Sequence, residues 1–173
     1  NYNLKPHSRP EEIILPVPKE KILKEIQELK QDCILFSIKN YIVFCAPSKK
    51  ISYILNEIGR LREITFREVG EGTNRSIDID EFDLHYYQMF IWDEDNKCIV
   101  GAYRIGKGKN ILRQFGKRGF YIHSLFRISN DFKPVLNESL ELGRSFIIKE
   151  YQKKPMPLFL LCKGILYFLL KNP

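Results

Sequence analysis

The sequence has few of the features that mark a secreted, metal-binding or membrane-spanning protein. Its 173 residues include only four cysteines, Cys33, Cys45, Cys98 and Cys162, which lie far apart and form no Cys-x-x-Cys pair. A disulfide framework and a structural zinc site are therefore not expected, and a reducing cytoplasm is the predicted compartment. No uncharged apolar run reaches the ~18 residues that a membrane-spanning helix needs. No signal peptide opens the chain.

Common catalytic and metal-binding motifs are also missing. His7, His85 and His123 are isolated and lack the spacing of zinc ligands, so no metal site is predicted. Ser145 lacks the second glycine of a nucleophile elbow and is interpreted as structural. The glycine-lysine stretch 106–109 is not followed by the Lys-Ser/Thr of a phosphate-binding loop, so we interpret it as a flexible basic turn.

What the sequence does contain is apolar material and positive charge. Hydrophobic residues make up 44% and aromatic residues 13% of the chain, enough for one folded domain, which excludes disorder for most of it. Lysine and arginine number 28 against 21 aspartates and glutamates, a net charge of +7. A basic surface favours polyanionic partners: nucleic acid, anionic lipid or an acidic carrier protein. Because basic and acidic residues are interspersed without a nucleic-acid-binding motif, nucleic acid is not expected.

The spacing of apolar residues predicts an α+β domain with a mostly antiparallel central sheet flanked by helices. Residues 1–18 are rich in proline and are predicted to form an extended arm before a domain at 19–173. Because the chain starts without methionine and stops just after an apolar segment, we interpret it as part of a longer protein. Helices are predicted over 19–30, from an N-cap at Ser48 to Gly70, and over 157–170; strands are predicted over 33–39, 41–47, 85–93, 98–106, 121–128 and 140–151.

Several charged residues fall where a buried core is predicted. Arg104 ends the apolar run IVGAYR, and Glu141 and Arg144 bracket Gly143 inside a core strand. Buried charges are costly unless they are paired with each other or with a ligand. A glycine inside a strand often marks a bulge, and one extra residue would bring Glu141 and Arg144 to the same side. This strand is therefore a candidate site, although solvated charges and helix caps remain the alternative for each residue alone.

Five runs in the order EIGRLREITFREVGEGTN, DIDEFDLHYYQMFIWD, IVGAYRIG, YIHSLF and ELGRSF resemble a known family. They are similar to bacterial N-acyltransferases of the ornithine- and glycine-lipid synthase type, some of which carry the label "hemolysin". These enzymes belong to the GNAT superfamily and are related to acyl-homoserine-lactone autoinducer synthases. The resemblance runs from about Leu29 to the C-terminus. It implies a GNAT-like, autoinducer-synthase-like fold that is truncated at its C-terminal end, because GNAT folds continue with further strands.

The resemblance also implies a site. Glu141 is the first candidate for the general base and Asp80 the second, while a backbone amide near Gly143 would polarise the thioester carbonyl. Arg104 and Arg144 would hold the carboxylate of the acceptor or the pantetheine of the donor. The acyl chain would lie between two splayed strands, IVGAYR and the strand of Gly143. The residues implied as catalytic are Glu141, Asp80 and Arg144, and those implied as substrate-binding are Arg62, Phe66, Asp83, Arg104 and Gly143.

The function implied by the resemblance is transfer of a long-chain (3-hydroxy)acyl group to the amine of a small amino acid, the first step towards an amino-acid-containing membrane lipid. The segment KEYQKKPMP stands where GNAT enzymes carry their pyrophosphate loop. Acyl carrier protein is therefore the implied donor and partner, ahead of acyl-coenzyme A, and no bound cofactor is expected.

Two alternatives stay open. One is the synthesis of a diffusible acyl-amino-acid signal. The other is a non-catalytic, basic membrane-surface module of the hemolysin type, suggested by the apolar segment FLLCKGILYFLL at 159–170. Since Lys163 interrupts this segment, we interpret it as a helix that packs on the sheet. The predicted location is the cytoplasm, with a peripheral contact to the inner membrane as an option.

Overall fold

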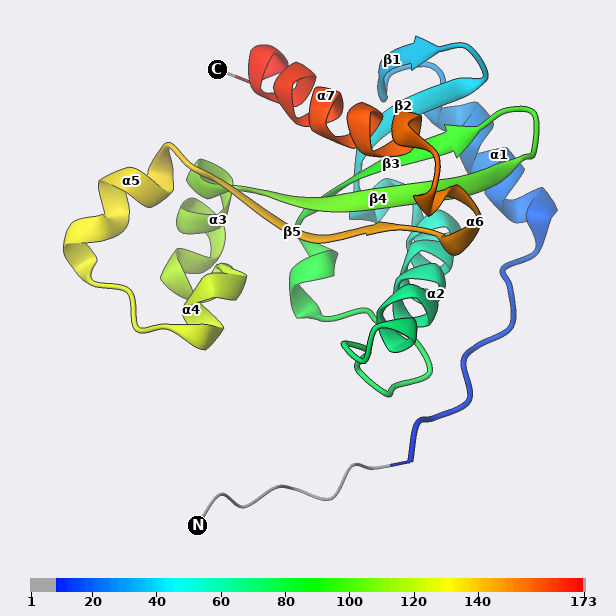
Figure 1. The fold of residues 1–173 in the computed structure, drawn as a ribbon. Helices are drawn as coiled ribbons and strands as arrows, with labels where there is room; N and C mark the ends of the chain where they lie inside the picture. Colours follow the sequence, from blue (N-terminus) through cyan, green and yellow to red (C-terminus); the bar gives the residue numbers. More distant parts are fainter. Residues whose placement is uncertain (1–8, 173) are drawn as a thin grey trace.

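A sheet of five antiparallel strands runs through the computed structural model, which describes residues 9–172 (Figure 1). The strands are β1 (Ile34–Ile38), β2 (Tyr41–Pro47), β3 (Tyr87–Asp93), β4 (Cys98–Lys107) and β5 (Leu140–Ile147). They lie side by side in chain order, so each strand pairs with its neighbours in sequence. The predicted α+β class with a mostly antiparallel central sheet is confirmed.

Helices cover both faces of this sheet (Figure 1). The helices are α1 (Lys19–Leu29), α2 (Ser52–Glu68), α3 (Gly108–Phe115), α4 (Tyr121–Leu125), α5 (Lys133–Asn137), α6 (Lys149–Gln152) and α7 (Pro155–Lys171). Because successive side chains of a strand point to opposite faces, β3 supplies two cores. Phe90 and Trp92 pack with α1 and α2, whereas Met89 and Ile91 pack with α7. The apolar C-terminal segment is therefore a helix packed on the sheet, as interpreted.

The start of α2 differs from the prediction. Ser48 is not its N-cap: α2 begins at Ser52, and the Ser48 hydroxyl donates to the carbonyl of Tyr86. The carboxylate of Glu25 on α1 accepts hydrogen bonds from the main-chain N–H groups of Tyr53 and Ile54 instead, at 3.0 and 2.8 Å. A tertiary contact thus replaces the local cap. The other end of α2 is as predicted, because Gly70 follows it with a φ of +78°.

Residues 108–139 form a helical insertion between β4 and β5, which contains α3, α4 and α5 (Figure 1). Two predictions are wrong here. The stretch 106–109 is not a flexible turn: Gly108 begins α3, and a Cβ there would lie 1.7 Å from the carbonyl oxygen of Leu136. The predicted strand over 121–128 is the short helix α4, whose first N–H groups are bound by Glu141 of β5. Contacts from distant residues override the local preference in both places.

The strands β4 and β5 are paired and not splayed. They match from Lys107 opposite Leu140 to Gly101 opposite Ile147, so the predicted cleft between them is wrong. The predicted bulge near Gly143 is confirmed. Between two neighbouring residue pairs of the ladder, the chain advances three residues along β5 but only two along β4. In the part of the chain that the structure describes, no strand pairs with the other edge of β5.

The N-terminal segment contains no helix or strand between residues 9 and 18. It runs beside residues 74–76, where the N–H groups of Glu11 and Ile14 donate to the carbonyls of Asn74 and Ser76 at 2.9 and 3.0 Å. Residues 1–8 of the predicted arm lie outside the described residues.

Candidate active site

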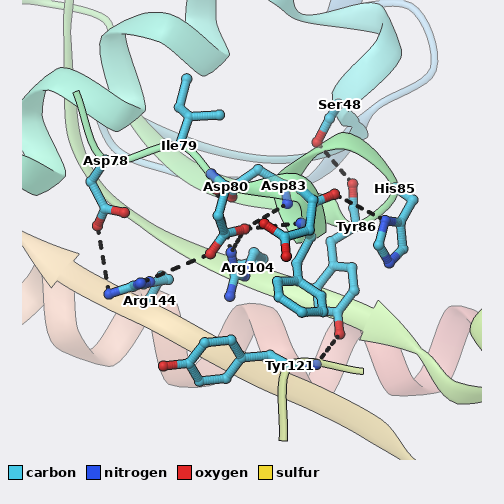
Figure 2. Close-up of polar contacts among 12 residues, drawn as sticks. Ser48, Asp78, Ile79, Asp80, Asp83, His85, Tyr86, Arg104, Tyr121 and Arg144 are labelled. Atoms are coloured by element: carbon cyan, nitrogen blue, oxygen red, sulfur yellow. Dashed lines mark hydrogen bonds and ion pairs between the residues drawn. The ribbon is translucent and has the colours of Figure 1, made fainter. Parts of the chain in front are cut away.

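Charged side chains from four separate segments meet beside β4 and β5, and Figure 2 shows those from three of them. Helix α2 supplies Arg62, the segment before β3 supplies three aspartates, β4 supplies Arg104 and β5 supplies Arg144. Arg62, Asp83 and Arg104 are at most 2% exposed. The cluster therefore contains three carboxylates and three guanidinium groups, most of which are removed from water. We call it the Arg–Asp cluster; its aspartates are Asp78, Asp80 and Asp83.

Arg62 holds the aspartate segment in place. Its Nε donates to Asp78 Oδ2 at 2.9 Å, and its two terminal nitrogens donate to the two carboxylate oxygens of Asp83 at 3.2 and 2.8 Å. It also donates to the main-chain carbonyl of Asp78. A planar guanidinium whose three nitrogens are all hydrogen-bonded is a rigid support, so Arg62 orients the aspartate segment.

Asp80 caps the short helix that contains Asp83. Its Oδ1 accepts from the N–H groups of Phe82 and Asp83 at 3.0 and 3.1 Å, and Asp83 Oδ2 accepts from the N–H of Asp80 at 3.0 Å. This reciprocal capping box fixes the Asp80 side chain. Arg104 lies 2.6 Å from the same Oδ1. The second oxygen, Oδ2, faces Arg144 and makes no hydrogen bond to described residues.

Burial and charge move the pKa values of the cluster in different directions. Burial raises the pKa of Asp78 above its ordinary value, because desolvation outweighs the arginines beside it. Burial acts in the same sense at Asp83, but Arg62 and Arg104 outweigh it and hold the pKa of Asp83 below its ordinary value. For Arg104, burial favours the neutral form, yet the neighbouring aspartates raise its pKa. Asp83 and Arg104 therefore form a fixed ionised pair at neutral pH.

Arg104 lies in an aromatic cage. Its guanidinium carbon is 5.7, 5.3 and 5.4 Å from the ring centres of Phe82, Tyr86 and Tyr121. Cation–π contacts of this kind favour a desolvated guanidinium. Its Nε is buried and has no hydrogen-bond partner among the described residues, so this buried donor of Arg104 is unused.

Arg144 has the least occupied side chain of the cluster. It lies at the bulge of β5 with a φ of +54°, a left-handed conformation that costs energy for any residue but glycine. Its terminal nitrogens are 3.7 and 3.8 Å from carboxylate oxygens of Asp78 and Asp80, beyond hydrogen-bonding distance, and its buried Nε has no partner within residues 9–172 (Figure 2). A half-buried guanidinium with free donors is suited to binding an anionic group.

Glu141 lies on the same side of the sheet, but its oxygens are occupied. They accept from the N–H groups of Tyr121 and Ile122 at 2.9 and 2.7 Å and from the hydroxyl of Tyr86. Burial and the neighbouring Glu141 raise the pKa of the Tyr86 hydroxyl, which stays a hydrogen-bond donor. Glu141 thereby fastens the helical insertion to the sheet.

The remaining predicted residues differ in their positions. Gly143 pairs with Arg104, and no atom lies within 4 Å of the place where its Cβ would be, so the strand is open to an approaching molecule there. Phe66 packs against the core beneath α1 and α2. Sequence reasoning missed Tyr86 and Tyr121, which stack on Arg104. The only available signal was their aromatic character. Because aromatic residues make up 13% of the chain and many occupy the core, this signal did not single them out.

A cavity of about 630 Å³ is lined in part by Phe82 and Tyr86, which also contact Arg104. Its wall includes His85 and Phe82 near the start of β3, and Ile111 and Phe115 of α3. Its size and mostly apolar wall are typical of sites for small organic groups. No cluster of three or more metal-binding side chains occurs within residues 9–172. Over the same residues, every helix is too short or too polar to cross a bilayer.

The sheet, its bulged fifth strand and the Arg–Asp cluster define the class of the domain. Residues 61–162, more than half of the chain, match the family model described as an acetyltransferase (GNAT) domain. The chain belongs to this family. The predicted GNAT-like fold and the prediction of an acyltransferase are thereby confirmed.

Two curated bacterial proteins are similar to the chain. A glycine N(alpha)-acyltransferase of Phocaeicola vulgatus is 36% identical over 148 residues, covering 82% of this chain and 45% of its own length. A glycine N(alpha)-acyltransferase of Bacteroides thetaiotaomicron is 37% identical over 149 residues, covering 82% of this chain and 43% of its own length. The chain thus spans less than half the length of these relatives. No solved structure matches it. The resemblance to amino acid N-acyltransferases is supported, and the ornithine-lipid and hemolysin assignment stays a prediction.

Proposed function

We propose that this domain transfers a long-chain (3-hydroxy)acyl group from a phosphopantetheine thioester to the amine of glycine, as the first step towards an amino-acid-containing membrane lipid. Both curated relatives are named for acylation of glycine. The observation that carries the proposal here is the Arg144 guanidinium, which is half-buried at an open strand and makes no hydrogen bond to any described residue.

Arg144 is the proposed binding group for the glycine carboxylate. A guanidinium and a carboxylate form two parallel hydrogen bonds, which fixes the orientation of the bound amino acid as well as its position. With the carboxylate held there, the α-amine lies near Asp80, whose Oδ2 is 3.8 Å from Arg144. The open space at Gly143 leaves room for the thioester to approach from the free edge of β5.

The amine has to lose a proton before it attacks. Asp80 Oδ2 is the better-placed base, because it makes no hydrogen bond to described residues, whereas the Glu141 carboxylate already accepts three. The neutral amine attacks the thioester carbonyl carbon, the carbonyl oxygen becomes an oxyanion, and collapse breaks the C–S bond. The attacking nitrogen loses a second proton as the amide forms; this proton goes to the leaving thiolate, and the first passes from Asp80 to solvent. A main-chain N–H on the free edge of β5 is the proposed oxyanion donor.

Acyl carrier protein is the proposed donor and partner, with acyl-coenzyme A as the alternative. The segment after β5 begins with α6 and continues into α7, and it exposes Lys153 and Lys154 between the two helices. Exposed lysines attract an acidic carrier over roughly a Debye length of 10 Å at 0.1 M salt.

The test is a product analysis. The protein is incubated with long-chain acyl carrier protein or acyl-coenzyme A and an equimolar mixture of amino acids, and the lipid products are identified by mass. N-acylglycine is the expected product, and at subsaturating glycine its formation should fall at least tenfold with Arg144→Gln but persist with Arg9→Gln, an exposed arginine outside the cluster. Acylation of another amino acid in preference to glycine would refute the acceptor assignment. Recovery of the product from the aqueous phase would favour a diffusible signal over a membrane lipid.

A further inference from the structure

The helical insertion, residues 108–139, contains basic side chains without acidic partners. Every ion pair among the described residues lies outside it. Its only acidic residues are Asp131 and Glu138. Lysines and arginines elsewhere in the chain are often paired, so this segment holds a concentration of uncompensated positive charge. The basic residues of the insertion are Lys109, Arg113, Lys117, Arg118, Arg127 and Lys133.

Four of these basic side chains surround one hollow. The hollow has a volume of about 490 Å³ and is lined by no aspartate or glutamate. His123 also lines it, and the Nδ1 of this ring is buried without a hydrogen-bond partner in the described part of the chain. The Lys117 ammonium donates to the carbonyl of Ile128 at 2.6 Å and holds the wall in shape. Such a hollow is suited to phosphate groups. Its basic residues are Lys117, Arg118, Arg127 and Lys133.

The same segment exposes large apolar side chains. Leu125, the last residue of α4, is 59% exposed, and Phe126, which follows it, is 65% exposed. Single exposed apolar residues are ordinary, but exposed apolar residues in a segment that also carries six basic residues indicate an interaction surface. Aromatic and aliphatic groups next to lysine and arginine are the composition of segments that lie in a membrane interface. The exposed apolar residues of the insertion are Phe115, Ile122, Leu125, Phe126, Phe132 and Val135.

We propose that the helical insertion docks the domain on the surface of an anionic phospholipid bilayer. Lipid phosphates occupy the hollow between Arg118, Arg127 and Lys133, and the exposed phenylalanines enter the boundary between headgroups and acyl chains. An acidic protein would match the charge but would not account for the exposed hydrocarbon, so a bilayer fits both observations. The proposal does not depend on the identity of the acceptor amino acid.

This surface adjoins the active site through α4. The N–H groups of Tyr121 and Ile122 are both bound by Glu141, yet the Tyr121 ring faces Arg104 and Arg144 while Ile122 is exposed. One turn of helix thus connects the site with the proposed membrane side. A long-chain product would leave the site close to the lipid phase in which it dissolves.

Vesicle binding tests the proposal without any catalytic readout. The wild-type protein is sedimented with vesicles of phosphatidylcholine alone and with increasing phosphatidylglycerol. Binding should rise with the anionic lipid and weaken with salt, because each basic group near the surface contributes and is screened. The double variant Arg127→Glu/Lys133→Glu should lower the partition coefficient at least tenfold. Phe126→Ser/Phe132→Ser should lower it as well, with less dependence on salt.

Matched controls keep the result specific. Lys24→Glu/Lys153→Glu makes the same change in net charge elsewhere, and Leu166→Ser/Leu170→Ser removes exposed apolar groups from α7; both should bind as wild type does. Hydrogen exchange of the wild type should show protection of residues 122–135 on addition of vesicles, a readout that needs no variant. Equal binding of the insertion variants and the wild type would overturn the proposal. So would binding to acyl carrier protein through these residues without binding to vesicles.

Discussion

The two ends of strands β3 and β4 differ in how completely their buried polar groups are hydrogen-bonded. At one end, Asp93 closes the turn between the strands, and five donors occupy its carboxylate. At the other end, Gln88 and Arg104 lie opposite each other, and each has a buried polar atom without a partner in the described chain. Buried polar atoms are normally satisfied, so the difference separates a structural end from a functional end of the same strands.

The Asp93 end joins three parts of the fold. Asn40 of the β1–β2 turn donates to Oδ1 at 2.8 Å, Asn96 of the β3–β4 turn donates to Oδ2 at 2.9 Å, and Tyr151 of α6 donates to Oδ2 at 2.7 Å. Burial works against ionisation of Asp93, but these hydrogen bonds outweigh it and lower its pKa to about 2. Neutral donors alone stabilise this charge, whereas the Arg–Asp cluster stabilises its charges with opposite charges and leaves donors free.

The largest expected effect is the loss of the base at the functional end. Asp80→Asn should lower kcat for acyl transfer by about two to four orders of magnitude, the range of a general base. The amide keeps an acceptor for the capping box, so the circular dichroism spectrum should be unchanged. Steady-state kinetics at saturating glycine measure the effect, and Asp93→Asn, assayed well below its melting temperature, is the control that should keep the wild-type kcat.

Glu141→Gln completes this test, because Glu141 is the other candidate base. We expect a smaller loss of kcat than for Asp80→Asn, together with a lower melting temperature from weakened attachment of the insertion. A larger loss than for Asp80→Asn, with the melting temperature unchanged, would transfer the role of base to Glu141.

The next effect concerns glycine binding. Arg144→Gln should raise KM for glycine by about 10- to 100-fold, the value of a charge-assisted hydrogen-bonded pair. The melting temperature should change little, because the guanidinium makes no hydrogen bond in the described structure. Arg62→Gln is the contrasting variant: it breaks a buried pair with Asp83 and should destabilise the protein strongly. A loss of stability with Arg144→Gln of the same size would make Arg144 a structural residue.

The structural end should respond in stability and not in chemistry. Asp93→Asn should lower the free energy of unfolding at pH 7 by roughly 2 kcal/mol, from the difference between a folded pKa of about 2 and an unfolded value near 3.8. Because the folded pKa is the lower one, this contribution is present above about pH 4 and is lost as the pH falls towards 2. Urea titrations at pH 7 and pH 3 should show a smaller pH dependence in the variant. The variant should keep part of the pH dependence of stability, because the hydrogen bond from Lys30 also lowers the pKa of Glu94 to about 2.

The smallest effect is expected for substitutions of exposed charged residues, which are neither buried nor held in one conformation. Lys153→Glu/Lys154→Glu should raise KM for acyl carrier protein several-fold and leave KM for acyl-coenzyme A nearly unchanged. The difference should shrink as salt is raised from 50 to 300 mM, since screening weakens exposed pairs. An equal change in KM for both donors would show that these lysines do not bind the carrier protein.

Patterns within one element predicted most of the fold. The apolar stripe of α2, the two hairpins and the bulge at Gly143 follow from periodicity and turn residues, and the structure contains each of them. The errors share a physical cause. Glu25 caps α2 in place of Ser48, and Glu141 turns a β-rich sequence at 121–128 into a helix. Both contacts join residues distant in sequence, and local propensity carries no information about them.

The site was predictable as a set but not as an arrangement. The cost of burying charge indicated a cluster of Arg104, Glu141 and Arg144, although only Arg104 is fully buried in the structure. Which of them retains free donors depends on side-chain geometry. All three nitrogens of Arg62 donate hydrogen bonds, whereas Arg144 donates none to residues 9–172, and nothing in the residue type distinguishes the two.

The strand order has a consequence for the protein while it is being made. Because β1 to β5 lie in the sheet in the order of synthesis, each strand finds its partner already present when it leaves the ribosome. The Arg–Asp cluster is completed later: Arg62 can pair with Asp83 once both have been made, and Arg144 on the last strand is the final member to be added. We therefore expect a nascent chain that is stalled before β5 to hold a folded sheet that cannot yet bind its substrates. Activity would begin only when the fifth strand is added.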